Sequence, residues 1–212
     1  LGFDVQIVSG RKGIKQAADH LRSSNIVAFP TETVYGLGGM ASNDDAVAKI
    51  FEAKSRPNFN PLIIHVADFQ TANCLVDFCP RSLKLAETFW PGPLTIVLNR
   101  ANNSEVSLLA GAGLKTTAIR MPDNDIALDL ICEAGGPIAA PSANKSGRVS
   151  PTRAIHVSEE FGDTIPCILD GGPCLLGLES TVIDFSDAIP TILRPGSITK
   201  QDIEEVLGEI AL

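Results

Sequence analysis

The chain has 212 residues, of which 44% are hydrophobic, and its formal net charge at pH 7 is -8. A chain of this length and apolar content can bury a hydrophobic core of its own. The acidic balance counts against non-specific binding of nucleic acid, because such binding depends on many Lys and Arg contacts to phosphates. No apolar run approaches the ~20 residues that span a bilayer, and no signal-peptide pattern opens the chain.

Five cysteines, an odd number, are scattered along the chain, and no two of them form a C-x-x-C pair. They are Cys74, Cys79, Cys132, Cys167 and Cys174. Only three histidines could join them as metal ligands, so we expect neither a disulfide framework nor a structural zinc site. Scattered cysteines fit a reducing compartment, and we expect a cytoplasmic protein that binds no metal through its own side chains.

Hydrophobic periodicity predicts alternating strands and helices. In the first half it predicts a strand at residues 3–7, a helix at 14–21, a strand at 26–29, a polar loop ending in glycines at 31–39, a helix capped at 43 or 44, a strand at 62–66 and a helix at 80–90. In the second half it predicts strands at 94–98 and 116–120 around a long loop, a helix ending at 135, a strand at 137–140, a polar loop at 141–151, a helix at 151–161, strands at 165–169, 181–185 and 191–194, and a helix capped at 199. No composition break divides the chain, so we expect residues 1–212 to form one α/β domain with a mixed sheet.

The segment from Lys54 to Leu62 places two cations and two prolines between a helical pattern and an apolar run. Pro57 and Pro61 fix their own φ angles and keep the preceding residues out of the helical conformation, so the loop should be stiff. A stiff loop carrying Lys54 and Arg56 suits an anion, because a guanidinium grips phosphate or carboxylate in a bidentate way. The alternative is a solvated pair of cations at a helix end, which the helix dipole favours.

Further cations lie in or beside loops that contain Pro or Gly, namely Arg120, Lys145, Arg148 and Arg194. The two usual phosphate-binding motifs, G-x-x-x-x-G-K-[ST] and G-x-G-x-x-G, are absent, and no G-x-S-x-G motif marks a hydrolase nucleophile. His65, near the end of a predicted strand, fits a core histidine as well as a ligand contact when taken alone. A bound nucleotide would therefore have to be held by the basic loops.

Seven short segments, spread over nearly the whole chain, carry hydroxyl or charged side chains. They are residues 30–38 (PTETVYGLG), 54–62 (KSRPNFNPL), 90–95 (WPGPLT), 118–122 (AIRMP), 141–144 (PSAN), 179–182 (ESTV) and 193–196 (LRPG). In these segments and in their order, the chain resembles the YrdC-like family, the L-threonylcarbamoyladenylate synthases. One such segment alone would be weak evidence, whereas seven in sequence are specific.

The resemblance implies a twisted mixed α/β sheet around a deep basic cavity. It also implies a reaction that joins L-threonine, bicarbonate and ATP into L-threonylcarbamoyladenylate and releases pyrophosphate. Mg²⁺ bound with ATP is the implied cofactor. The implied partner is a separate transferase that modifies a tRNA adenosine next to the anticodon; direct tRNA binding is left open, and no membrane partner is expected.

Carried over residue by residue, the resemblance assigns Lys54 and Arg56 to catalysis by charge stabilisation. It assigns the ATP side of the cavity to Arg56, Asn60, Thr116, Ser142, Ser150 and Arg194. It assigns the L-threonine side to Thr33, His65, Arg120, the backbone at Ala140, and Ser180. In this scheme a carbamate oxygen on threonine attacks the α-phosphorus of ATP, so the protein orients two anions and needs no nucleophile of its own.

Two other functions stay open at this point. An RNA-binding module would use the same basic concavity without chemistry, although the charge of -8 and the sparse aromatic residues count against it. A carbamoyl-adenylate-forming domain would use carbamoyl phosphate in place of threonine and bicarbonate, but such domains usually sit in larger chains with cysteine-rich segments. Some family members continue through a linker into a second domain, and this chain is either the short form or a piece of the longer one.

Overall fold

The computed structural model describes residues 5–57, 59–162 and 164–211. The helices in this part of the chain are α1 (Gly10–Arg22), α2 (Asp44–Lys54), α3 (Phe69–Leu75), α4 (Pro80–Phe89), α5 (Asp125–Ala134), α6 (Ala154–Phe161) and α7 (Lys200–Leu207). The strands are β1 (Gln6–Ser9), β2 (Val27–Phe29), β3 (Gly36–Met40), β4 (Ile63–His65), β5 (Leu94–Asn99), β6 (Thr116–Arg120), β7 (Ile138–Ala139), β8 (Cys167–Asp170), β9 (Thr181–Asp184) and β10 (Thr191–Arg194).

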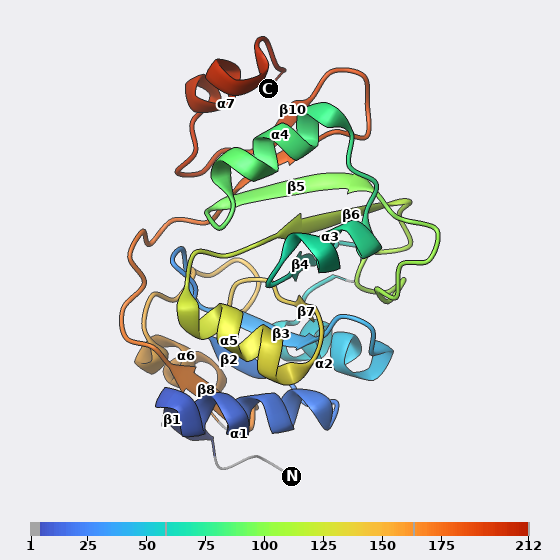
Figure 1. Ribbon diagram of the computed structural model, residues 1–212. Coiled ribbons are helices and arrows are strands. Elements are labelled where there is room, and N and C mark those ends of the chain that lie inside the picture. The colour runs from blue at the N-terminus through green and yellow to red at the C-terminus, as the bar shows by residue number, and fades with distance from the viewer. Residues whose placement is uncertain (1–4, 58, 163, 212) are drawn as a thin grey trace.

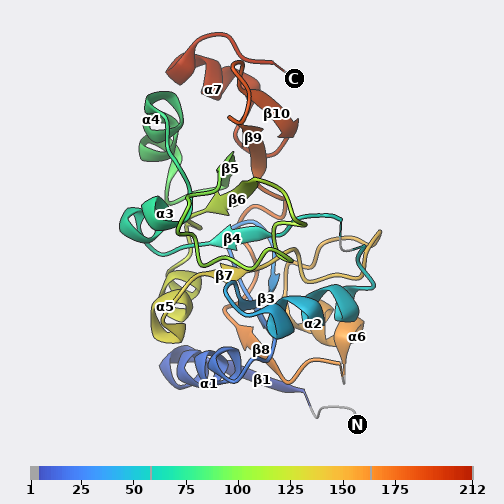
Figure 2. The same ribbon diagram turned by 90° about the vertical axis from the view of Figure 1, so that its right-hand side faces the viewer.

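All of these strands join one mixed sheet, in the order β1-β8-β2-β3-β7-β4-β6-β5-β9-β10. Strand β8 pairs in parallel with β1 and β2, β4 with β6, and β5 with β9, and the other neighbours are antiparallel. Helices α1, α3, α4 and α5 lie on one side of the sheet and α2 and α6 on the other, while β1 and β10 lie at opposite ends of the molecule (Figure 1 and Figure 2). The α/β fold with a mixed sheet is therefore confirmed.

Side chains at the predicted helix ends explain where the helices begin and stop. Asn43 accepts a hydrogen bond from the amide of Ala46 at 2.9 Å and caps α2. Thr199 and Asp202 form a reciprocal capping box at the start of α7. Helix α5 ends at Gly135, whose φ of 82° is a left-handed conformation that glycine adopts without strain. These predicted starts and this predicted stop are confirmed.

The glycines of the predicted polar loop at 31–39 form a strand instead, because Gly36–Met40 is β3. A Cβ atom at Gly38 would lie 2.5 Å from Cγ2 of Ile138 and 2.7 Å from Cε1 of Phe29. Glycine is thus required for the close packing of β3 against its neighbours, although its weak strand propensity predicts a loop. The prediction of a loop over the whole segment was wrong for its second half.

Three further differences concern element boundaries. Helix α3 was not predicted; it is a single short helix that begins where Asp68 accepts a hydrogen bond from the amide of Thr71 at 2.6 Å. Helix α6 begins at Ala154, three residues after its predicted start. The first strand begins at Gln6, and residues 3 and 4 of its predicted range lie outside the described residues.

Candidate active site

A cavity of about 430 Å³ lies over the middle of the sheet. Strands β3, β4, β5, β6, β9 and β10 contribute lining residues, and so do the loops at 31–34, 56–61, 140–142 and 179–180. Six of the seven segments that carry the family resemblance reach this cavity, although they are far apart in the sequence. The described residues of the seventh, 90–95, are absent from the lining and lie behind it.

Nine of the twelve predicted site residues line this cavity. They are Thr33, Arg56, Asn60, His65, Arg120, Ala140, Ser142, Ser180 and Arg194. The three that stand back from it are Lys54, Thr116 and Ser150. The fold therefore gathers most of the predicted residues in one place, while the role of each of them stays a prediction.

Lys54 lies behind the cavity wall, contrary to the expectation that it would sit on the loop beside a ligand. It is the last residue of α2, only 1% of it is exposed, and its Nζ atom donates hydrogen bonds to the carbonyls of Ser142 and Asn144. Burial, followed by the nearby charge of Arg56, lowers the pKa of Lys54 to about 8. In this structure the ammonium ties the end of α2 to the loop that contains Ser142.

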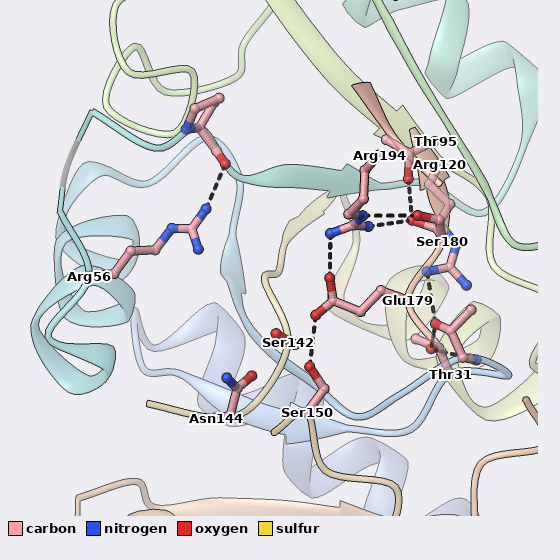
Figure 3. Close-up of polar contacts among 12 residues, drawn as sticks. Thr31, Arg56, Thr95, Arg120, Ser142, Asn144, Ser150, Glu179, Ser180 and Arg194 are labelled. Carbon is pink, nitrogen blue, oxygen red and sulfur yellow. Dashed lines mark hydrogen bonds and ion pairs between the residues drawn. The ribbon is translucent and has the colours of Figure 1, made fainter. Parts of the chain in front are cut away.

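Arg56 is held by its own loop, as the prolines predict. Its Nε atom donates to the carbonyl of Asn60 at 3.3 Å. One terminal nitrogen donates to the carbonyl of Pro61 at 3.2 Å (Figure 3). Burial lowers the pKa of Arg56, and the carboxylate of Glu179 acts in the opposite direction. The guanidinium is thus presented to the cavity from a braced loop; residue 58 of that loop lies outside the described residues.

Glu179 is a cavity residue that the sequence analysis did not assign to the site. Its carboxylate pairs with Arg194 and accepts a hydrogen bond from Oγ of Ser150 at 2.8 Å (Figure 3). Burial raises the pKa of Glu179, but Arg194 and the hydroxyl groups of Ser150 and Ser142 bring it below its usual value, so the group is ionised. Ser150 is therefore linked to the cavity lining by its hydrogen bond to Glu179.

Thr116 opens strand β6 on the same face as two lining residues. Side chains alternate along a strand, so Thr116, Ala118 and Arg120 face one side of the sheet. Only Ala118 and Arg120 line the cavity. Thr116 lies at the far end of this row, where strand β6 pairs with Asn99.

Arg120 is 4% exposed and is already paired within the protein. A terminal nitrogen lies 2.7 Å from Oε1 of Glu32, the other terminal nitrogen donates to Oγ1 of Thr33 at 3.0 Å, and Nε donates to the carbonyl of Gly92 at 3.2 Å. No sequence pattern had indicated Glu32 as the partner of Arg120. A ligand carboxylate would share the guanidinium with Glu32, because the two groups are buried together.

His65 stays neutral in this site. It is 4% exposed, and burial, followed by the charge of Arg120, lowers the pKa of its imidazole to about 3. Its Nδ1 atom is buried without a hydrogen-bond partner in the described part of the chain, and the ring lines the cavity. An unpaired buried nitrogen in a cavity wall is costly unless a ligand or water meets it.

The described residues contain no group of three or more His, Cys, Asp or Glu side chains that could hold a metal ion. Within the same ranges, every helix is too short or too polar to cross a lipid bilayer.

The chain is similar to one family model and to several known proteins. The model of the Sua5/YciO/YrdC family, described as "Telomere recombination", matches residues 19–196. The threonylcarbamoyl-AMP synthase of Bacillus subtilis is 54% identical over 198 residues, which cover 93% of this chain and 57% of that protein. The threonylcarbamoyl-AMP synthase of Pyrococcus abyssi is 51% identical over 200 residues, which cover 94% of this chain and 58% of that protein.

A solved structure extends the likeness to three dimensions. The structure of P. abyssi Sua5 complexed with L-threonine matches this fold with a TM-score of 0.92 and 49% sequence identity, over 98% of this chain and 62% of that one. This chain thus spans less than two thirds of the length of these relatives. The family model, the identities and the shared fold agree, and the chain belongs to the Sua5/YciO/YrdC family.

Proposed function

We propose that this chain is the ATP- and threonine-binding domain of an L-threonylcarbamoyladenylate synthase, which joins L-threonine, bicarbonate and ATP and releases pyrophosphate. The observation that carries the proposal is that one cavity brings together two sets of side chains. Arg56 and Arg194 line it beside Ser142, and buried hydrogen-bonding groups line it around Arg120. Two relatives at 51–54% identity carry the name of this activity.

The cationic end suits the phosphates of ATP. Guanidinium groups bind phosphate through charge-assisted, often bidentate hydrogen bonds, and Arg56 and Arg194 both line this end of the cavity. Lys54 would act from behind the wall, by its charge and by holding the loop of Ser142 in place. The assignments of Asn60, Thr116 and Ser150 to ATP stay predictions.

The part of the cavity around Arg120 suits an amino acid of defined shape. Thr33, His65 and Ser180 offer hydroxyl and imidazole groups that are at most 4% exposed, and Arg120 supplies a cation for a carboxylate. The backbone at Ala140 completes the lining. A site built from buried polar groups rejects ligands that leave these groups without partners.

The role of the protein in this reaction is to orient the two reactants. The amine of threonine reacts with bicarbonate to form a carbamate with loss of water, a carbamate oxygen attacks the α-phosphorus of ATP, and pyrophosphate leaves. Both reactants are anions, so the protein must hold them against their mutual repulsion and place the two reacting atoms in line. The arginines at both ends of the cavity supply the positive charge for this arrangement.

Mg²⁺ fits the cavity as a companion of the phosphates. This ion keeps several waters and is usually bound by phosphates with one or two carboxylates, and Glu179 is a carboxylate in the lining. Its two oxygens already meet Arg194 and Ser150, so the phosphates would supply most of the ligands. When bound, the ion would offset negative charge on the triphosphate.

The other partners belong to the same proposal. The product would pass to a separate transferase that modifies a tRNA adenosine next to the anticodon, and bicarbonate would supply the carbamoyl carbon. A cytoplasmic location stays a prediction from the cysteine pattern. Direct contact with tRNA is not part of the proposal, because the net charge of -8 does not favour it.

The proposal is tested by incubating the chain with Mg²⁺, ATP, labelled bicarbonate and labelled L-threonine. We expect one acyl-adenylate that contains both labels and equimolar pyrophosphate, and we expect neither when threonine or bicarbonate is left out. Carbamoyl phosphate in place of threonine and bicarbonate tests the carbamoyl-adenylate alternative. An adenylate formed from carbamoyl phosphate alone would overturn the proposal.

A further inference from the structure

The directions of four hydroxyl groups around the amino-acid end can be worked out from their partners. Oγ1 of Thr31 lies 2.7 Å from the carbonyl of Val34. A carbonyl cannot donate, so the single proton of Thr31 is used there. In the 2.8 Å contact between the hydroxyls of Thr31 and Thr33, the donor is therefore Thr33, and Oγ1 of Thr31 also accepts longer hydrogen bonds from the amides of Thr33 and Val34, at 3.2 and 3.3 Å. Thr33 also accepts from Arg120, which leaves it one lone pair and no proton for a ligand.

The donor can be assigned in the same way at Ser180, a second hydroxyl that lines the cavity. Its Oγ accepts a hydrogen bond from Arg194 at 3.0 Å and lies 2.8 Å from Oγ1 of Thr95 (Figure 3). Thr95 is 0% exposed, and among the described residues its hydroxyl has Ser180 as its partner. If Ser180 donated to Thr95, the proton of Thr95 would be buried without an acceptor, which is costly.

If Thr95 donates instead, the Ser180 proton is the one group of this cluster left without a partner, and Ser180, unlike Thr95, lines the cavity where a ligand can accept it. Ser180 then accepts twice, from Arg194 and from Thr95, and both of its lone pairs are occupied. The proton of Ser180 is free, and Ser180 lines the cavity. The cavity therefore offers a lone pair at Thr33 and a proton at Ser180, so these two lining positions have opposite hydrogen-bonding character.

We propose that Thr95 is a positioning residue, which donates to Ser180 and thereby reserves the Ser180 proton for an acceptor oxygen of the amino-acid substrate. Thr95 is the second residue of strand β5 and is absent from the cavity lining. Among the described residues its hydroxyl reaches the lining through its hydrogen bond with Ser180. The group placed at Ser180 must be an acceptor, such as the hydroxyl, carboxylate or carbamate oxygen of the substrate. The group placed at Thr33 must be a donor, such as an amine or a hydroxyl.

This inference rests on the proposed function, because it concerns the amino-acid end of the same cavity. The test is calorimetric titration of L-threonine into the wild-type chain and into Thr95→Val and Thr95→Ser. Val keeps the shape and removes the hydroxyl, whereas Ser keeps the hydroxyl. Loss of one hydrogen bond should weaken threonine binding about 3- to 10-fold in Thr95→Val, and Thr95→Ser should restore it to within about twofold of wild type.

A double-mutant cycle separates positioning from packing. In a Ser180→Ala background the effect of Thr95→Val should fall below about twofold, because there is no hydroxyl left to orient. Thr117→Val is the matched control: Thr117 is 3% exposed on strand β6, its Oγ1 has no partner among the described residues, and it faces away from the side of Ala118. Its threonine affinity should equal that of wild type.

The outcomes are distinct. Equal threonine affinities for Thr95→Val and Thr95→Ser, or an undiminished effect of Thr95→Val in the Ser180→Ala background, would overturn the positioning role while leaving the proposed function intact. A wild-type chain that binds no threonine would refute the amino-acid site itself, and the inference with it. Thermal unfolding checks that each variant is folded, and Thr95→Ala, which also lacks the hydroxyl, replaces Thr95→Val if that variant is not.

Discussion

Two arginines of the cavity keep a protein carboxylate beside them. Glu32 lies 2.7 Å from Arg120, and Glu179 pairs with Arg194. Arg120 is 4% exposed, and a buried cation without a counter-ion is expensive. Both carboxylates hold their arginines in place before any anion binds. The sequence indicated the arginines, because each ends a predicted strand, but it could not indicate their acids, since the pairing exists only in the folded chain.

A substitution of Arg56 tests whether the cationic part of the cavity binds ATP. Arg56→Ala removes a charge-assisted contact to phosphate, so ATP binding should weaken by about 1.5–3 kcal/mol, and the fold should persist because the side chain bonds only within its own loop. Arg148→Ala is the control, since Arg148 pairs with Glu160 and its side chain is 66% exposed. Calorimetry of ATP binding gives the comparison, and equal affinities for the two variants would rule out the role of Arg56.

Lys54 should link ATP binding to a proton. Its pKa is about 8 in the free protein, and the negative charge of bound ATP should raise that pKa. Above about pH 8 the binding of ATP should therefore take up a proton, and ATP affinity should fall as the pH rises further. Titrations in buffers of different ionisation enthalpy measure the uptake. Proton uptake that persists in Lys54→Met would show that another group is responsible.

Thr33, His65 and Ser180 should select the side chain of the amino acid. Serine loses one methyl contact worth roughly 1–3 kcal/mol, so it should be a poor substrate. Valine keeps the shape of threonine but leaves buried polar groups without a partner, and such sites reject an analogue by roughly 10⁴-fold or more. Competition among the three amino acids at fixed ATP and bicarbonate gives the order, and use of valine as readily as serine would show that the pocket recognises shape alone.

At the scale of elements, the sequence predicts the strands better than their arrangement. The apolar runs at β2, β5 and β6 follow local patterns, and their predicted ranges overlap the observed ones. The sheet order does not follow from local pattern, because β8 inserts between β1 and β2 from far along the chain. The glycines of β3 mislead for a related reason: they serve close packing against residues that only the fold brings near.

Gly196 follows strand β10 and packs closely against the backbone of residues 179–181, at the start of strand β9. A Cβ atom there would lie 2.4 Å from the amide nitrogen of Thr181 and 2.6 Å from the carbonyl oxygen of Glu179, and neither backbone atom can move freely. Gly196→Ala should therefore destabilise the fold by on the order of 1–3 kcal/mol and weaken threonine binding. Gly111→Ala, where the added atom would lie 3.7 Å from its nearest neighbour, is the control. Matching urea unfolding curves for the two variants would contradict this account.

Negative charge predominates over the whole molecule, whereas positive charge gathers at the cavity. The chain carries a net charge of -8, yet Arg56, Arg120 and Arg194 all line one cavity. An acidic chain with a basic cavity favours small anions over a nucleic-acid backbone, which needs many exposed cations. The overall charge and the site cations were both readable from the sequence, whereas their convergence on one cavity required the folded sheet.

The central claim is that one cavity holds ATP and L-threonine at the same time, at separate ends. The most direct measurement is calorimetric titration of L-threonine into the chain, alone and saturated with Mg²⁺ and a non-hydrolysable ATP analogue, with Arg56→Ala and Ser180→Ala beside wild type. We predict threonine binding in both conditions, with Ser180→Ala weakening threonine and Arg56→Ala weakening the nucleotide. Mutual exclusion of the two ligands, or one variant abolishing both in a folded chain, would contradict the claim.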